Sequence, residues 1–175
     1  MIETVVTSEH LDAFMPRLSF LDRRETEILS DSFGLTDNPR FLIETSLQQS
    51  FYVRMLLDVT GQPLAIYGCQ EIPGRDGRPF GCPWLQSADA TYFSQTDTAR
   101  LVKSLKKSVQ DWHQTYDRLE GFSWAGATHH HKLLKLLGFE LSEELHEHHG
   151  KPIAPVVAFC RNLENIRTGE KYYVC

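Results

Sequence analysis

The sequence contains no long run of apolar residues. None approaches the roughly 20 residues that a helix needs to cross a bilayer. The opening segment, Met1–Val6, also lacks the basic region and the long apolar stretch of a signal peptide. We therefore expect no membrane span and a cytoplasmic location.

Cysteine is scarce, and its spacing excludes a common metal and redox motif. The four cysteines are Cys69, Cys82, Cys160 and Cys175, and no two of them form a CxxC pair. Such spacing favours buried free thiols in a reducing compartment. A pairing of Cys69 with Cys82 across a hairpin stays open, because its geometry cannot be tested from sequence.

The chain also lacks an excess of positive charge. It has 18 Lys and Arg against 23 Asp and Glu, for a net charge of −5. This balance provides no general attraction to phosphate backbones, so nucleic acid is not the expected partner. By contrast, 41% of the 175 residues are hydrophobic, which suits one domain burying about 70% of its unfolded surface.

The hydrophobic spacing predicts a mixed α/β architecture. We expect one central mixed sheet of about six to seven strands flanked by helices, with a parallel pair at its centre. Ser8 is the expected N-cap of the first helix, and Thr96 or Asp97 is the expected N-cap of the longest helix. The expected strands cover 2–7, 51–59, 64–70, 80–87, 119–125, 139–145 and 153–160, and the expected helices cover 8–16, 21–33, 38–47, 96–112 and 128–137.

One segment carries a specific resemblance. Residues 122–139 read as a strand, a turn, a helix and a terminal Leu137-Gly138-Phe139. Together with the element order, this segment is similar to the GNAT acetyltransferase fold. The glycine ends the helix in a left-handed conformation, so that Phe139 enters the next strand.

The chain also resembles a family of small GNAT-like proteins from short-tailed phages that includes internal virion protein A. The resemblance covers roughly residues 1–161 and leaves 162–175 as a C-terminal tail. It rests on the charged run Leu21–Glu25, the hairpin strand Gln62–Gly68, the segment Pro83-Trp84-Leu85 and His130, eight residues before the glycine of Leu-Gly-Phe.

The GNAT resemblance implies an acetyl-CoA site that this sequence only partly matches. GNAT enzymes cradle the pyrophosphate in a glycine-bearing loop, but the matching residues 92–100 contain no glycine, and Asp97 would repel a phosphate. We therefore expect no cofactor, or acetyl-CoA if the fold is still active. In that case the implied cofactor-binding residues are Leu85, Gln86, Ser87, Thr96, Asp97, Thr98 and Arg100.

The positions that match the GNAT catalytic residues are also altered. Ala127 stands where many of these enzymes have Asn, and Leu134 stands where they have a tyrosine general acid. Leucine cannot donate a proton. The residues able to substitute are Tyr92, His113, Tyr116 and the run His129–His131, and the sequence does not choose among them.

Two histidine clusters, His129–His131 and the group His146, His148 and His149, invite a metal interpretation. Consecutive residues His129–His131 on a helix point in different directions, whereas His146 and His148 would share one face of a strand. We nevertheless predict no metal site and interpret both clusters as solvated or hydrogen-bonded, with His130 as a packed helix residue.

Other conspicuous residues have structural interpretations. Lys103, Lys106 and Lys107 are expected to form a solvated helix face, and Arg23-Arg24-Glu25 a surface charge network. The large aromatic residues Trp84, Phe93 and Trp112 are expected in the core.

The resemblance to the phage family implies a virion-assembly factor or internal virion component with a degenerate acetyltransferase-like fold. Its partners would be phage virion or host proteins, in the cytoplasm of the infected cell or in the particle. Two alternatives remain: an active N-acetyltransferase that modifies a host or phage protein, and a non-catalytic inhibitor of a host protein. Fold alone does not decide among them.

Overall fold

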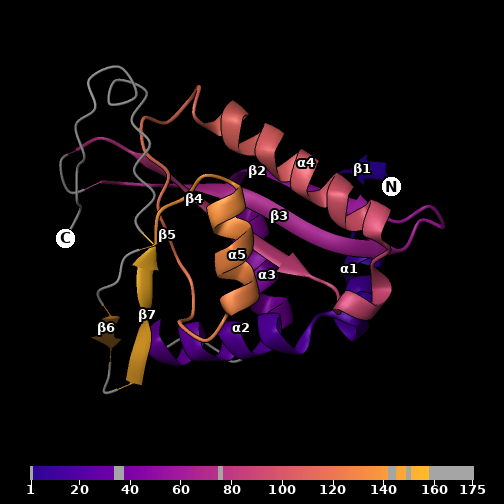
Figure 1. Cartoon of the computed structure of the whole chain (residues 1–175), viewed down its shortest axis with the longest axis horizontal. Coiled ribbons are helices and arrows are strands. Elements are labelled where there is room, and N and C mark those ends of the chain that lie inside the picture. The colour runs from indigo at the N-terminus through magenta and orange to yellow at the C-terminus, as the bar shows by residue number, and fades with distance from the viewer. Residues whose placement is uncertain (1, 34–37, 75–76, 142–144, 149–150, 158–175) are drawn as a thin grey trace.

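The computed structural model describes residues 2–33, 38–74, 77–141, 145–148 and 151–157 (Figure 1). Side chains are described throughout these ranges except at 29–33, 122, 145–148 and 151–157. The elements in chain order are β1 (Ile2–Thr4), α1 (Ser8–Phe14), the short 3-10 helix η1 (Met15–Arg17), α2 (Phe20–Phe33), α3 (Pro39–Gln49), β2 (Ser50–Leu57), β3 (Pro63–Ile72), β4 (Phe80–Ser87), the short 3-10 helix η2 (Ala90–Tyr92), α4 (Gln95–Trp112), β5 (Gly121–Phe122), α5 (Thr128–Leu136), β6 (Leu145–His148) and β7 (Lys151–Val157).

The expected α/β class is confirmed, but the sheet is divided. Strands β1 to β4 form an antiparallel sheet in sequence order, and β5, β7 and β6 form a separate three-stranded sheet. The prediction of a single sheet with six to seven strands is therefore wrong. The expected parallel pair is reduced to one bridge between Gly81 and Leu119, because β4 and β5 diverge after it.

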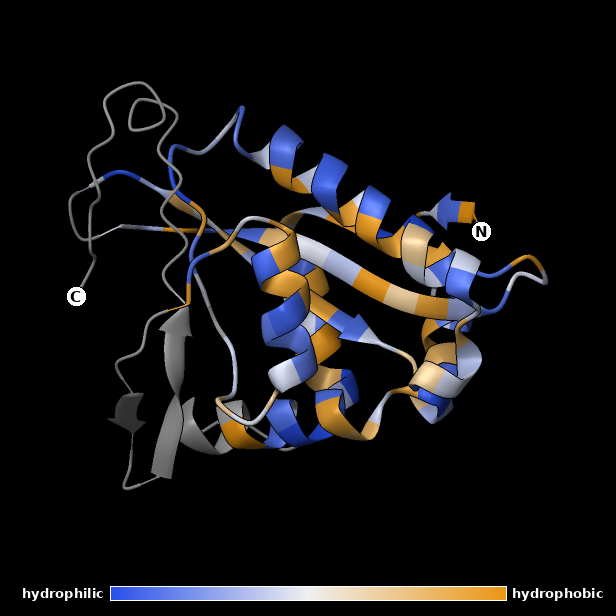
Figure 2. Cartoon of the chain, in the orientation of Figure 1, coloured by the Kyte–Doolittle hydropathy of each residue, from blue (hydrophilic) through white to orange (hydrophobic). Residues whose placement is uncertain are grey.

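Helices cover both faces of the four-stranded sheet (Figure 1). On one face, Leu105 of α4 belongs to the same buried cluster as Tyr67 of β3. On the other face, Phe14 of α1 and Ile43 of α3 pack with Ile66. Adjacent residues of β3 therefore serve opposite cores, as the alternation of a strand requires. Figure 2 shows the hydrophilic residues of α4 on the side away from the sheet.

The N-cap residues of two helices differ from the predicted ones. The N-cap of α1 is Thr7 rather than Ser8, and its side chain forms a capping box with His10. The N-cap of α4 is Ser94 rather than Thr96 or Asp97, and Asp97 completes its capping box. In each case the side chain three residues into the helix returns to the cap.

The later strands also differ from their expected bounds. The strand expected at 119–125 is limited to Gly121–Phe122, because β4 and β5 diverge beyond the bridge between Gly81 and Leu119. Residues 139–141 are not in a strand, and β6 begins at Leu145. Strand β7 covers Lys151–Val157, while 158–160 and the predicted tail lie outside the described residues.

Several structural interpretations of single residues are confirmed. Cys69 and Cys82 are free thiols, while Cys160 and Cys175 lie outside the described residues. Trp112 is buried. The remaining residues in this group are partly buried Trp84 and Phe93, and exposed Lys103, Lys106 and Lys107.

Among the helices that the structure describes, none combines the length and apolar character that crossing a membrane demands.

Candidate functional site

The site lies where β4 and β5 separate, a region that we call the fork. At its closed end, the Gly81 amide donates to the Arg118 carbonyl at 3.1 Å, and the Glu120 amide donates to the Gly81 carbonyl at 2.9 Å. Strand alternation turns the backbone groups of Leu85 toward this same open edge. Pro83, between them, has no amide hydrogen to offer.

A cavity of about 150 Å³ occupies the fork. Most of its wall is apolar and comes from β4, from the second half of α4 and from α5. Its polar side chains are Glu25, Gln86, Ser123 and His130. The lining residues are Glu25, Pro83, Trp84, Leu85, Gln86, Leu105, Val109, Trp112, Gly121, Ser123, His130, Leu133, Leu134, Leu137 and Phe139.

Helix α2 closes the open end of β4. The Ser19 amide donates to the Ser87 carbonyl at 2.9 Å. Asp22, which is fully buried, accepts from the Ser87 amide at 3.3 Å and from the Ser87 hydroxyl at 2.9 Å. It also accepts from the Ser19 hydroxyl. At Ser87, the backbone edge of β4 is thus satisfied by Ser19 and by Asp22 of α2 instead of by β5.

Glu25, one turn further along α2, contacts polar groups of the segment that follows β5. Its Oε1 accepts from the Ser123 hydroxyl at 2.9 Å and from the Trp124 amide at 2.6 Å. Its Oε2 lies 2.8 Å from Nδ1 of His130. Glu25 therefore connects the segment after β5 and the first turn of α5 to helix α2.

His130 links the two carboxylates. Its Nε2 lies 3.5 Å from Asp22 Oδ1, which is an ion-pair distance but longer than a well-formed hydrogen bond. Burial acts to lower the pKa of His130, but the interactions with Asp22 and Glu25 outweigh it and raise the pKa to about 10. With no other group bound, the ring is a buried imidazolium between two carboxylates.

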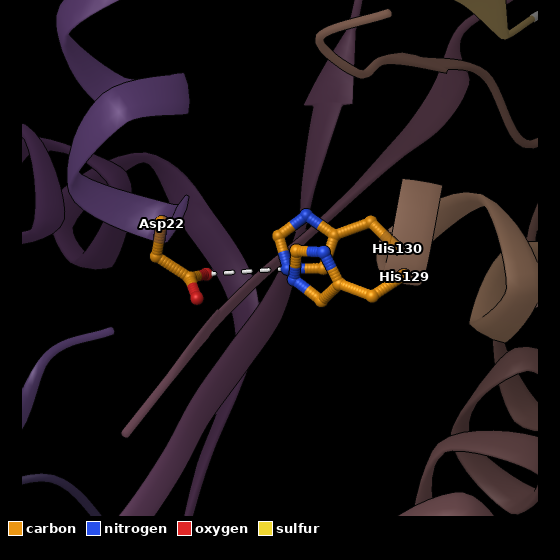
Figure 3. Close-up of side chains that lie close together, drawn as sticks. All are labelled: Asp22, His129 and His130. Atoms are coloured by element: carbon orange, nitrogen blue, oxygen red, sulfur yellow. Dashed lines mark ion pairs between the residues drawn. The ribbon is translucent and has the colours of Figure 1, made fainter. Parts of the chain in front are cut away.

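His129 completes a group of possible metal ligands. Asp22, His129 and His130 each offer one ligand atom within 4.8 Å of the others (Figure 3). The two imidazole rings have centroids 4.0 Å apart and an interplanar angle of 45°, so the expectation that consecutive histidines of this helix point in different directions is wrong for this pair. Burial and the neighbouring charge of His130 lower the pKa of His129. The side chains of the other predicted pair, His146 and His148, are not among those described.

The interpretation of Arg23-Arg24-Glu25 as a surface network is wrong for one member. Glu25 is buried at 7% exposure, whereas Arg24 forms an exposed pair with Glu27 at 2.9 Å. Arg23 donates to the Met15 carbonyl. Sequence reasoning missed Asp22 and Glu25 as site residues. Their spacing of three places both on one helix face, a signal that charge counting alone does not use.

The structure separates the implied cofactor-binding residues into two groups. Leu85 and Gln86 line the fork cavity, whereas the Ser87 amide and hydroxyl are bonded to Asp22 of α2 and the Ser87 carbonyl to the Ser19 amide.

The second group lies at the start of α4, away from the cavity wall. Asp97 accepts from the Ser94 hydroxyl at 2.6 Å, and the Ser94 hydroxyl accepts from the Asp97 amide at 3.1 Å. The capping box thus occupies one of the amides that such a helix start offers to anions. The other members, Thr96, Thr98 and Arg100, are exposed and do not line the cavity.

The possible substitutes for a tyrosine acid are also dispersed. Tyr116 is buried, and its hydroxyl donates to Glu71 at 2.6 Å. Tyr92 is 44% exposed and stacks under Arg17. Neither these tyrosines nor His113 lines the cavity, whereas His130 does.

Comparison with solved structures shows the GNAT fold. One similar structure is the NatB acetyltransferase complex bound to CoA and MES, with a TM-score of 0.58 and 11% identity over 91% of this chain and 95% of that one. Another is ribosomal-protein-alanine N-acetyltransferase from Brucella melitensis, with a TM-score of 0.57 and 12% identity over 89% of this chain and 96% of that one. The NatC complex bound to Gag peptide and CoA has a TM-score of 0.56 and 14% identity over 82% of this chain and 87% of that one.

The sequence comparisons add no family assignment. No protein-family model matches the chain, and no curated protein matches it in sequence. At 11% to 14% identity, the structural likeness shows the fold alone.

Proposed function

We propose that this protein is an acetyl-CoA-dependent N-acetyltransferase that uses the fork cavity to hold the pantetheine arm of the cofactor. The single observation that carries the proposal is the cavity itself: an apolar space of about 150 Å³ between diverging strands, in a GNAT-like fold. The solved structures of NatB and NatC that share this fold have CoA bound.

The residues of the fork suit an amide-containing arm. Leu85 turns its amide and carbonyl toward the open edge, where they can pair with the amides of the arm as a neighbouring strand would. Leu105, Leu133 and Leu134 surround the space with apolar surface. Side chains of this kind exclude water and favour burial of methylene groups.

When bound, the cofactor supplies an acetyl thioester. The nitrogen of an unprotonated amine bonds to the acetyl carbon while the carbon–sulfur bond breaks, and the amine proton passes by way of solvent to the departing thiolate. This chain would contribute chiefly by positioning, which by itself can supply a large part of the rate. We assign no proton transfer to His130, because carboxylates face both of its ring nitrogens.

The test is a calorimetric titration with acetyl-CoA. We expect saturable binding of about one equivalent to the wild type and loss of binding in Leu134→Trp, which fills the cavity. Leu136→Trp is the matched control, because Leu136 is 53% exposed on the same helix and does not line the cavity. Absence of binding at millimolar cofactor, or equal binding by both variants, would overturn the proposal.

Binding should be followed by a transfer assay. Release of free CoA thiol is measured with peptides that have either an unblocked N-terminal amine or a lysine side chain. Thiol release that depends on the peptide amine is expected from an acetyltransferase. Binding without transfer to either class would reject the catalytic part of the proposal.

A second function is a non-catalytic scaffold in phage virion assembly. The capping box of Ser94 and Asp97 favours it, because a carboxylate stands at the helix start where an enzyme of this fold would hold pyrophosphate. The resemblance to the phage family is its other support. Normal infectious particles from a phage that lacks the protein would reject this function, and a stoichiometric host-protein complex would favour an inhibitor.

A further inference from the structure

Two acidic side chains of α2, Asp22 and Glu25, converge on His130 in the interior. Both carboxylates are buried, at 0% and 7% exposure. In the part of the chain that the structure describes, His130 is the basic side chain within 4 Å of either carboxylate. Burying carboxylates is costly unless donors or a cation lie beside them.

The hydrogen bonds around this cluster orient two atoms toward each other. Glu25 Oε2 lies 2.8 Å from His130 Nδ1, so it fixes the proton on that nitrogen and leaves Nε2 directed at Asp22. His130 is 9% exposed, and its Nε2 is buried without a hydrogen-bond partner. A carboxylate that holds the far nitrogen of a histidine is the usual outer support of a metal ligand.

Asp22 is oriented in the same manner. Its Oδ2 accepts from the hydroxyls of Ser19 and Ser87, while its Oδ1 faces His130. The Oδ1 to Nε2 separation is 3.5 Å. Ligand atoms about 2.0–2.2 Å from a tetrahedral zinc ion are separated from each other by about 3.4 Å. Asp22 Oδ1 and His130 Nε2 therefore lie at nearly the separation that two ligand atoms of one zinc ion require.

We propose that Asp22 Oδ1, His130 Nε2 and a ring nitrogen of His129 bind a zinc ion, with the remaining coordination position open to water. His129 provides the third ligand and the route of entry, since it is exposed while its ligand atom lies within 4.8 Å of the other two. Imidazole nitrogen with carboxylate oxygen is a ligand set that zinc accepts.

Zinc binds imidazole through an unprotonated ring nitrogen, so a proton on a ligating nitrogen would pass to solvent when the ion binds. A divalent cation beside two buried carboxylates would supply the counter-charge that burial of such groups requires. The site borders the fork cavity, whose wall includes Glu25 and His130, but the proposal does not depend on acetyl-CoA binding.

The experiment uses the full chain without a polyhistidine tag, freed of metal with a chelator and titrated with Zn²⁺ in a calorimeter. Co²⁺ provides a second readout, because its visible absorption reports coordination geometry. We expect one tight equivalent of Zn²⁺ and no competition from a large excess of Mg²⁺, which prefers oxygen ligands.

Variants locate the ion. His129→Ala should weaken Zn²⁺ binding by at least about 100-fold, and Glu25→Gln by about 10- to 100-fold as an outer-shell change. His131→Ala is the matched control, because His131 is the next residue of the same helix and lies outside the group. His129 is exposed, so its replacement preserves the fold and keeps the test interpretable even where a variant of buried Asp22 fails to fold.

Three results would overturn the proposal. The first is the absence of a tight Zn²⁺ equivalent in the wild type, which would leave His130 as a structural link between Asp22 and Glu25. The second is equal affinity in His129→Ala and His131→Ala. The third is loss of binding on replacement of His146 and His148 alone, which would move the ion to the other histidine cluster. Acetyl-CoA titration of the same samples separates this outcome from failure of the cofactor site.

Discussion

Nδ1 of His130 lies 2.8 Å from Oε2 of Glu25, and this contact joins helices α5 and α2 across the fork. The two residues are 105 positions apart in the chain. Glu25 also holds the Ser123 hydroxyl and the Trp124 amide, so one carboxylate fixes three groups of the second half of the protein. The shape of the cavity depends on this residue.

Replacing Glu25 with alanine should therefore strongly destabilise the metal-free protein. The change leaves the charged ring of His130 and the Trp124 amide without their buried acceptor. We expect a loss of about 3–5 kcal/mol in the free energy of unfolding, measured by urea denaturation. Glu27→Ala, which breaks an exposed pair with Arg24, should cost less than about 1 kcal/mol. Equal losses would contradict this account.

Gly81 sets how closely the two arms approach at the closed end of the fork. A Cβ at this position would lie 2.7 Å from Leu119 Cδ2 and 2.9 Å from Cys69 Sγ. We expect Gly81→Ala to cost about 1–3 kcal/mol through overpacking. The free energy of unfolding, followed by urea denaturation, measures this cost.

A double-mutant cycle with Leu119→Ala tests the cause of that loss. Removing the nearest side chain should relieve part of the clash, so the cycle should show a favourable coupling of at least about 0.5 kcal/mol. Gly61→Ala is a control for backbone strain alone. Gly61 has φ of +84° and open space around it. Strict additivity of Gly81→Ala and Leu119→Ala would show that the arms are not in contact.

The thiol of Cys82 should react slowly with alkylating agents. Burial, with a smaller contribution from the charge of Glu120, raises its pKa to about 11. Because the thiolate is the reactive form, a shift of two units lowers its population about 100-fold at neutral pH. Peptide-resolved mass spectrometry should find labelling of Cys82 by iodoacetamide about 100-fold slower in the folded protein than in urea. Comparable rates would reject a buried thiol.

The β2–β3 turn should become less stable in acid. Burial acts to raise the pKa of Asp58, but hydrogen bonds from Thr60 and Gln62 outweigh it and lower the pKa. The contribution of a carboxylate with a lowered pKa is present above its unfolded pKa of about 4 and is lost as pH falls through the folded value.

Asp58→Ala measures that contribution. We expect a loss of about 1–2 kcal/mol at pH 7 relative to the wild type, and a smaller difference below pH 4, in urea denaturation at several pH values. Asp58→Asn keeps an acceptor oxygen for the amides of Thr60 and Gln62 and should retain most of the stability. A difference that stays constant with pH would show that ionisation of Asp58 is not involved.

The sequence by itself determined the elements and the class of the fold. Periodic apolar residues such as Leu101, Leu105 and Val109 specify α4, and local turn chemistry at Gly61 specifies the hairpin of β2 and β3. These signals act over a few residues, so they can be read directly from the chain. The bounds of β4 were predicted for the same reason.

Only the tertiary structure decided where β4 and β5 part and what fills the space between them. Divergence of two strands depends on packing among α2, α4 and α5, which no local pattern encodes. The burial of Asp22 and Glu25 likewise follows from contacts with Ser87, Ser123 and His130. From sequence alone, a charged helix face is expected to be exposed to solvent. Here polar groups from distant parts of the sequence take the place of water as hydrogen-bond partners, and Asp22 and Glu25 therefore lie buried at the centre of the site.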